Sequence, residues 1–328
     1  MADFAVLETT AGRSQWADVW EQFKNHKGAV IGAVVFIFIV LAVIFGPMVW
    51  PHDPVKPDIR NRNIRHIVAC FGVDWSLIAS CFISPSEAGV KVSWSHPLGT
   101  DNLGRDITSR MLLGGRISMA VGACAMLLAL VVGTAVGVVA GYFKWLDGLL
   151  MRLTDLFLAL PLLPLLLVMV MLFREPLSAA MGIEKGIFVL IVVGIGMTSW
   201  MPTARIVRGD VLALKEREFI LAARSIGTKP GKMILRHLLP NVMSPIMVSA
   251  TLGIATAIIT ESVLSFLGLG FPPDFPTWGR LLNDGVQYMQ QYPERVVWPG
   301  ILISAVVLSV NYVGDGLRDA LDPRIRGR

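Results

Sequence analysis

Charged residues are scarce in this sequence. Asp, Glu, Lys and Arg make up 16% of the 328 residues, whereas 54% are hydrophobic. A soluble domain usually carries about 25% charged residues, so this chain lacks the polar side chains that would cover a water-facing globule. The same composition excludes a disordered chain, a coiled coil and a collagen-like rod. The class that remains is an all-α integral membrane protein with several spans.

Motifs for catalysis are also missing. The nearest match to a phosphate-binding G-x-x-x-x-G-K-[ST] loop is residues 227–233, which is one residue short and ends in Met. The sequence has neither the H-E-x-x-H motif of metalloproteases nor the G-x-S-x-G motif of serine hydrolases. We therefore expect a chain that is not an enzyme by itself and holds no cofactor or metal of its own.

Six apolar runs are long enough, or nearly long enough, to cross a bilayer. They cover residues 29–50, 117–141, 156–173, 186–202, 242–267 and 297–317. The runs are continuous, whereas a β-barrel would show short alternating segments. Pro161, Pro164 and Pro245 fall inside these runs, and we expect helix kinks at them because neighbouring helices can satisfy the freed carbonyls.

The distribution of Lys and Arg predicts the orientation. Residues 203–240 carry eight basic against three acidic residues, and residues 318–328 carry four against two. The positive-inside rule places both segments in the cytoplasm. With six spans, the tail 1–28 is then also cytoplasmic, and residues 51–116 form an extracytoplasmic loop. Topology explains the basic excess, so we expect no nucleic-acid partner.

The three cysteines differ in their predicted surroundings. Cys70 and Cys81 share the extracytoplasmic loop, where conditions are oxidising, and both a disulfide and two free thiols are compatible with their spacing. Cys124 lies inside the second span, where we interpret it as a small packing residue. His66 lies near Cys70, but the spacing fits no standard set of metal ligands, so we predict no metal site.

Small residues recur on one face of the second span. Gly133, Gly137 and Gly141 are spaced four apart, which places all three on the same side of a helix. Small residues at this spacing allow two helix backbones to approach closely in a membrane. We therefore predict that this face packs against another helix.

Glu261 is an acidic residue in the fifth span. A carboxylate is costly inside a bilayer and should face protein or a water-lined interior. Two interpretations stay open from the sequence. Glu261 either lines a translocation pathway or is a structural carboxyl paired with hydroxyl groups where two helices meet.

Residues 203–240 form more than a simple connection. Residues 211–226 have helical composition, Gly227 stands where that helix would end, and Pro230 precedes a second helical stretch that reaches Leu239. Ala222 and Ala223 leave the backbone near the turn accessible. The segment either docks a cytoplasmic partner or lies as a basic loop on lipid headgroups.

This segment resembles the EAA motif of ABC importer permeases. The matching residues are Leu221, Ala222, Ala223, Gly227, Leu239 and Pro240, with Leu221 and His237 in place of the usual Glu and Ile. Other stretches are similar to the dipeptide, oligopeptide and nickel branch of that family, and the overall match is nearest to its DppC-type subunits. These stretches are 23–29, 96–101, 104–106, 109–110, 115–118, 265–270, 277–279 and 314–323. Residues 58–93 match no such pattern, and we interpret them as an insertion.

The resemblance implies a type I, MetI-like permease with a core at residues 117–317. It implies a second permease as partner in a heterodimer, two cytoplasmic ATPases that use ATP and Mg, and an extracytoplasmic substrate-binding protein. It also implies the bacterial inner membrane as location and di- or oligopeptides as cargo. Nickel chelates or glutathione are the alternatives within the family, and an ion-coupled secondary transporter is the alternative outside it.

Overall fold

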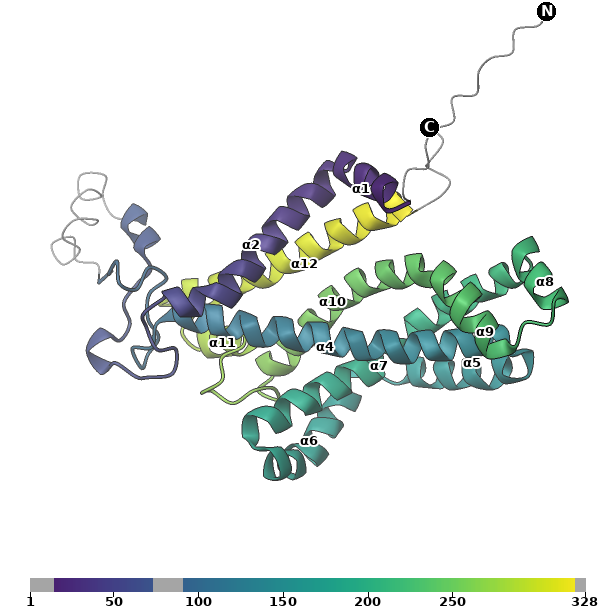
Figure 1. The fold of residues 1–328 in the computed structure, drawn as a ribbon. Coiled ribbons are helices and arrows are strands. Elements are labelled where there is room, and N and C mark those ends of the chain that lie inside the picture. The colour runs from purple at the N-terminus through teal and green to yellow at the C-terminus, as the bar shows by residue number, and fades with distance from the viewer. Residues whose placement is uncertain (1–14, 73–90, 322–328) are drawn as a thin grey trace, which may run out of the picture.

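The computed structural model describes residues 15–72 and 91–321, which are mostly helical (Figure 1). Six helical segments in the described residues are long and apolar enough to cross a membrane, as the sequence predicts. They are α2 (Lys27–Val49), α4 (Ile107–Tyr142), α6 (Leu162–Met181), α7 (Ile183–Lys215), the segment Pro230–Phe266, and α12 (Glu294–Leu321).

Shorter elements complete the chain. The segment Pro230–Phe266 consists of α9 (Pro230–Met233), a π turn (Ile234–Leu238), a 3-10 turn (Leu239–Val242) and α10 (Met243–Phe266). The other short helices are α1 (Gln15–Asn25), α5 (Lys144–Ala159), α8 (Glu218–Ser225) and α11 (Trp278–Val286), with 3-10 turns at Ile59–Asn61 and Ile67–Gly72. Two isolated β-bridges, Arg65–Val92 and Thr100–Asp106, lie in the connection between α2 and α4.

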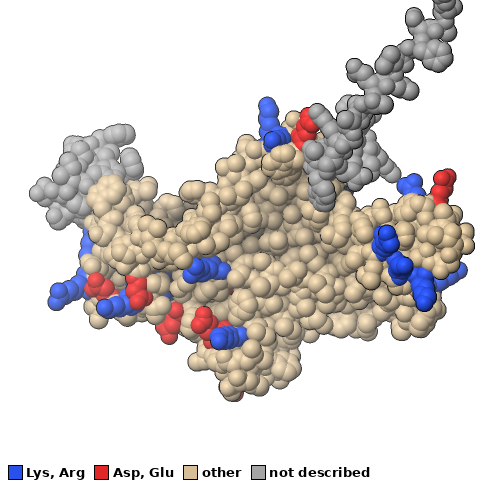
Figure 2. Space-filling model, viewed as in Figure 1, with Lys and Arg blue, Asp and Glu red and all other residues tan. Residues whose placement is uncertain are grey.

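The long helices run between two ends of the molecule (Figure 1). We call the end that carries the α2–α4 connection and α11 the loop end, and the end that carries α1, α8 and α9 the α8 end. In the view of Figure 2, most visible Lys, Arg, Asp and Glu side chains lie toward these two ends, and the surface between them is mainly uncharged. Such a band is what the hydrocarbon core of a bilayer requires.

Two helices extend well beyond the apolar runs that predict them. The second run starts at residue 117, whereas α4 starts at Ile107, because the Asp106 carboxylate accepts a hydrogen bond from the backbone N–H of Ser109 at 2.7 Å and caps the helix. The fourth run ends at residue 202, whereas α7 continues to Lys215. Hydropathy marks only the part of a helix that lipid can cover, so it misses both extensions.

The predicted kinks at Pro161 and Pro164 are wrong. Helix α5 ends at Ala159, Pro161 is the N-cap residue of α6, and Pro164 lies in the first turn of α6. Pro245 lies in the first turn of α10, but α10 continues the helical segment Pro230–Phe266 directly after its π and 3-10 turns, so a kink at Pro245 stays a prediction. Proline fits the first turn of a helix because the N–H that it lacks would have no partner there. The predicted third span, 156–173, therefore joins the end of α5 to the first part of α6.

Helices α4 and α7 pack closely along the three glycines of α4. A Cβ atom added to Gly133 would lie 2.6 Å from the carbonyl oxygen of Trp200, and one added to Gly137 would lie 2.6 Å from that of Ala204. At Gly141 an added Cβ would lie 2.7 Å from the Cβ of Val211. At each of these three positions, a side chain would fit only if α7 shifted away. The glycine face of α4 is thus in direct contact with the backbone of α7.

Candidate functional site

Helix α8 is held to the end of α7 by a small apolar cluster. Ile220 is fully buried and Ala223, three residues later, is buried beside it. They pack with Val211 of α7, Met233 of α9 and Leu238 of the π turn. This spacing puts one side of α8 against the protein. The opposite side of α8 faces away from the protein.

The outward side of α8 and the following turn are apolar. Phe219, Leu221 and Ile226 are exposed, and Ile226 keeps 84% of its surface accessible. Gly227 follows with φ of +79°, a left-handed conformation that glycine adopts without strain. The backbone N–H of Gly227 donates to the Arg224 carbonyl at 3.0 Å and closes the turn. An exposed apolar tip outside the membrane-crossing segments is typical of a docking surface.

The other residues that match the EAA pattern lie around this tip. Ala222 is exposed, Ala223 is buried against α7, Leu239 is half-buried and Pro240 is exposed. Some residues of the motif thus attach it to the protein, as Ala223 does, whereas others, such as Ala222 and Pro240, face outward. The roles of these residues in coupling stay a prediction.

An ion pair attaches α7 to α5, and hydrogen bonds attach it to α4, near α8. Arg208 of α7 donates from Nε and Nη2 to the two carboxylate oxygens of Asp147 in α5, at 2.5 and 2.7 Å. This contact holds the pKa of Asp147 below its usual range. Lys215 donates to the carbonyl oxygens of Gly141 and Tyr142 at 3.1 and 3.0 Å, which satisfies the free C-terminal end of α4. The end of α7 is thus attached at two places.

Glu261 lies at the centre of a buried polar chain nearer the loop end. It has no exposed surface, and its two oxygens accept hydrogen bonds from the hydroxyls of Ser118 in α4 and Ser265 in α10, at 2.8 and 2.7 Å. The backbone N–H of Trp278 in α11 donates to Ser118 Oγ at 3.3 Å. Glu261 therefore connects three helices inside this chain. The arrangement matches the structural alternative, and lining of a pathway stays a prediction.

The cysteine predictions have different outcomes. Cys124 is exposed on α4, so the interpretation as a packing residue within the chain is wrong. Cys70 is buried and disulfide-bonded, whereas Cys81 lies outside the described residues, so the pairing of these two cysteines stays a prediction. Residues 73–90 of the predicted insertion also lie outside the described residues.

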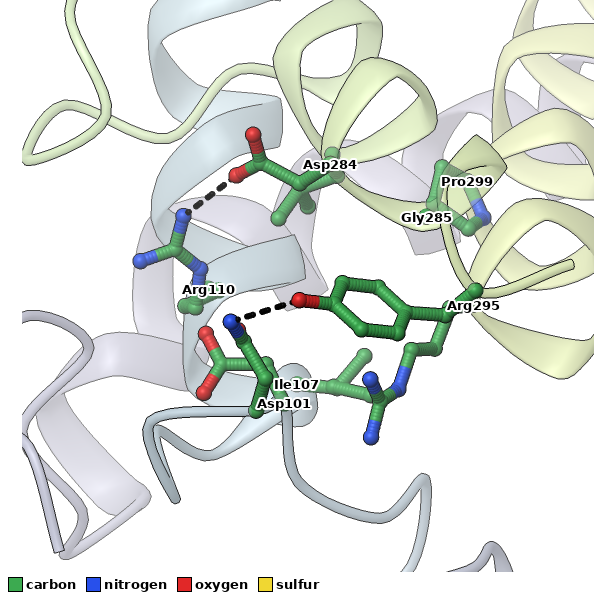
Figure 3. A pocket seen from close by; sticks show the side chains of 10 residues that line it. Asp101, Ile107, Arg110, Asp284, Gly285, Arg295 and Pro299 are labelled. Carbon is green, nitrogen blue, oxygen red and sulfur yellow. Dashed lines mark hydrogen bonds and ion pairs between the residues drawn. The ribbon is translucent and has the colours of Figure 1, made fainter. Parts of the chain in front are cut away.

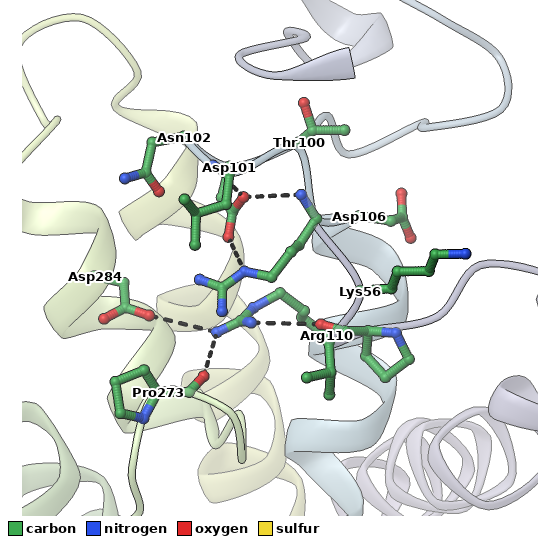
Figure 4. Close-up of polar contacts among 12 residues, drawn as sticks. Lys56, Thr100, Asp101, Asn102, Asp106, Arg110, Pro273 and Asp284 are labelled. Carbon is green, nitrogen blue, oxygen red and sulfur yellow. Dashed lines mark hydrogen bonds and ion pairs between the residues drawn. The ribbon is translucent and has the colours of Figure 1, made fainter. Parts of the chain in front are cut away.

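The sequence reasoning missed a cluster of arginines and aspartates at the loop end. Arg110, near the start of α4, and Arg295, near the start of α12, line a cleft together with Asp101 and Asp284 (Figure 3). Arg110 is 1% exposed and reaches the Pro54 and Pro273 carbonyls and Asp284 (Figure 4). An arginine inside a membrane-crossing helix indicates a functional site. Arg110 did not show this signal in the sequence because the apolar run starts seven residues later, although α4 already begins at Ile107.

The fold and the family of the chain follow from comparison with known proteins. Residues 129–327 match the family described as the binding-protein-dependent transport system inner membrane component, and residues 14–65 match the N-terminal TM domain of oligopeptide transport permease C. The chain belongs to this family of ABC importer permeases and is a multi-pass protein of the inner membrane. The family consists of transport components rather than enzymes.

Particular relatives cover nearly the whole chain. It is 36% identical to the dipeptide transport system permease protein DppC of Alkalihalophilus pseudofirmus and to the oligopeptide transport system permease protein OppC of Bacillus subtilis, each over 95% of this chain and 91% of the relative. It is 34% identical to the glutathione transport system permease protein GsiD of Pectobacterium atrosepticum, over 99% of this chain and 97% of the relative.

A solved structure confirms the predicted fold class. A chain of the MetNI methionine ABC transporter in an inward-facing conformation superposes with a TM-score of 0.50 and 19% sequence identity, over 64% of this chain and 95% of that chain. At this identity the similarity concerns the fold alone. The predicted six-helix, MetI-like permease fold is thus confirmed.

Proposed function

We propose that this chain is one permease subunit of an ATP-driven importer for di- or oligopeptides. A second, different permease would complete the translocation pathway. Two ATPases that use ATP and Mg would bind the α8 end, and an extracytoplasmic binding protein would deliver the solute at the loop end. Lipid would surround the uncharged band between the ends.

The exposed tip of α8 is the observation that carries this proposal. Its apolar side chains, Phe219, Leu221 and Ile226, face away from the chain, while Ile220 and Ala223 attach the helix firmly to α7. A partner that moves this tip therefore moves α7 with it. This is the property that a coupling helix between an ATPase and a membrane domain needs.

The orientation follows from charge. Eight Lys and Arg residues lie at 203–240, which includes the end of α7, α8 and α9. The positive-inside rule then assigns the α8 end, and with it both termini, to the cytoplasm. The loop end is extracytoplasmic, which is the side from which a binding protein delivers its cargo.

The choice of peptides as cargo comes from the relatives. Two of those described above are named for dipeptide and oligopeptide transport, and a third is named for glutathione, itself a small peptide. A nickel chelate is the remaining candidate of the family. Uptake assays with labelled dipeptide, glutathione and nickel chelate in proteoliposomes would distinguish these cargoes.

A pair of substitutions at Ile226 tests the coupling role. Ile226→Glu places a charge on the exposed tip, and because the residue contributes little to the fold, the complex should remain inserted. We expect loss of the ATPase from the purified complex and loss of solute-stimulated ATP hydrolysis. Ile226→Val keeps the tip apolar and should behave as the wild type.

Two results would refute the proposal. Normal stimulated hydrolysis by Ile226→Glu would show that the tip contacts no ATPase. Uptake by vesicles that contain this chain alone, without nucleotide, would instead identify a secondary transporter.

A further inference from the structure

The cleft at the loop end contains more positive than negative charge. Four arginines surround it or its rim: Arg105, Arg110, Arg280 and Arg295. Among the described residues, the carboxylates that pair with them are Asp101 and Asp284, whereas the buried Glu294 beside Arg295 lies 3.9 Å from His66. The arginines come from the loop before α4, from α4, from α11 and from α12, so the fold brings together charges that are distant in sequence.

The two carboxylates have their strongest contacts with the two rim arginines. Asp101 accepts a hydrogen bond from Arg105 Nε at 2.6 Å, and its other oxygen accepts from the backbone N–H groups of Leu103 and Arg105, each at 2.9 Å. Asp284 pairs with Arg280 at 3.0 Å and reaches Arg110 only at 3.4 Å. The charges of Arg105 and Arg280 are therefore matched. Arg110 shares Asp284 with Arg280, and Arg295 forms no ion pair among the described residues.

Arg295 has no carboxylate within ion-pair distance among the described residues. It is 5% exposed, its Nη2 donates to the Asn63 side chain and to the Thr100 carbonyl at 2.8 Å each, and its guanidinium lies 4.2 Å from the centre of the Tyr292 ring. Its Nη1 is buried and has no hydrogen-bond partner. A buried guanidinium without an anion is unfavourable, so the site is incomplete as it stands.

The shape and charge of the cleft select one kind of anion. The cavity between Arg110 and Arg295 is small, about 30 Å³ for the centre of a water-sized group, and Asn102 and Tyr288 are hydrogen-bonded to each other at its wall (Figure 3). A planar guanidinium matches the two oxygens of a carboxylate. The nearby Asp101 and Asp284 would repel a multiply charged anion such as phosphate.

We propose that this cleft binds a single carboxylate group, held by the guanidinium groups of Arg110 and Arg295. The carboxylate comes either from a free small acid or from the C-terminus of a short peptide at the extracytoplasmic side. The second source rests on the proposed function, whereas the first does not.

Thermal unfolding of the assembled complex in nanodiscs tests the site. Sodium acetate is compared with acetamide, its neutral counterpart of similar shape, at constant sodium concentration. We expect acetate to raise the unfolding temperature saturably and acetamide to leave it unchanged. An equal response to both, or no saturable response to acetate or to a dipeptide, would overturn the proposal.

Variants locate the effect. Arg295→Gln should weaken acetate binding, so that the half-saturating acetate concentration rises at least tenfold. If this variant does not assemble, Arg295→Lys, which keeps the charge but loses the planar guanidinium, is measured in its place. Arg65→Gln is the matched control, because Arg65 lies over the same Tyr292 ring but is exposed and does not line the cleft. The control should respond as the wild type. An unchanged half-saturation in the Arg295 variants would overturn the assignment.

A second arm distinguishes the two sources. Dialanine and its C-terminal amide are titrated in the same assay. Stabilisation by dialanine at lower concentration than acetate, with none by the amide, assigns the site to a peptide terminus. Stabilisation by acetate alone assigns it to a free carboxylate. These stabilisation measurements do not depend on transport. The carboxylate site and the proposed import activity are therefore tested independently of each other.

Discussion

Gly137 is the position where the contact between α4 and α7 can be tested most directly. An alanine Cβ at this position would lie 2.6 Å from the carbonyl oxygen of Ala204 and 2.8 Å from the Cβ of Val207. An ordinary contact needs about 3.4 Å or more, so α7 must move away by nearly 1 Å. Gly133 and Gly141 make similarly close contacts along the same face, and the shift would weaken those contacts too. Overpacking of this kind usually costs about 1–3 kcal/mol.

The matched control is Gly209→Ala in α7. An added Cβ at Gly209 meets no atom within 4 Å, so this variant gains the helix propensity of alanine without a clash. Because that gain is common to both substitutions, Gly137→Ala should unfold about 1–3 kcal/mol more easily than Gly209→Ala. Denaturant titration of the purified chain in mild detergent, followed by loss of helical circular dichroism, measures the difference. Equal stability of the two variants would refute the close contact.

Three further predictions concern titratable groups. Hydrogen bonds from Arg208 lower the pKa of Asp147, so this contact stabilises the fold above about pH 4 and is lost as the pH falls through the lowered pKa. Asp147→Asn should therefore lower the denaturant midpoint of unfolding at pH 7 but have little effect at pH 2. Burial lowers the pKa of His66, although Glu294 acts in the opposite direction, so the folded state favours the neutral imidazole. The stability of the fold should therefore decline below about pH 6.5. His66→Gln should remove this pH dependence when unfolding is compared from pH 5 to 8. Glu261→Ala should cost about 2–4 kcal/mol because two buried hydroxyls lose their acceptor and a cavity opens. Glu261→Gln should keep most of that stability, and impaired transport by a normally assembled Glu261→Gln complex would support a pathway role.

The membrane class and the number of spans were predictable because each depends on local composition, whereas the single helix predicted over 211–226 is wrong, since α7 ends at Lys215 and α8 runs from Glu218 to Ser225. Continuous apolar runs predict spans, and Gly227 with Pro230 predicts the turn that separates α8 from α9. The start of α4 was not predictable from hydropathy, because a cap at Asp106 and charged residues in the first turns extend the helix beyond its apolar part. Pro161 and Pro164 were misread because a proline at the start of a helix and one in its middle look alike in an apolar run.

The candidate sites show the same division. The glycine face of α4 could be predicted from spacing alone, although its partner α7 could not. Glu261 could be identified as unusual, but its hydrogen bonds to Ser118 and Ser265 depend on how α4 and α10 meet. The cleft between Arg110 and Arg295 joins residues 185 positions apart, and no local pattern connects them.

The arrangement of α4 also bears on how the two ends could communicate. This helix has 36 residues and thus spans about 54 Å, from Ile107 at the loop end to Tyr142 near α8. Its backbone contacts α7 along the glycine face, and Lys215 ties the end of α7 to the last carbonyls of α4. We expect two helices that are in such close contact and joined at one end to move together. A displacement of the α8 tip would therefore reach Ser118, and through it Glu261 and α11, without any change inside α4. On this reasoning, Gly137→Ala should weaken the coupling of ATP hydrolysis to transport as well as the stability of the fold.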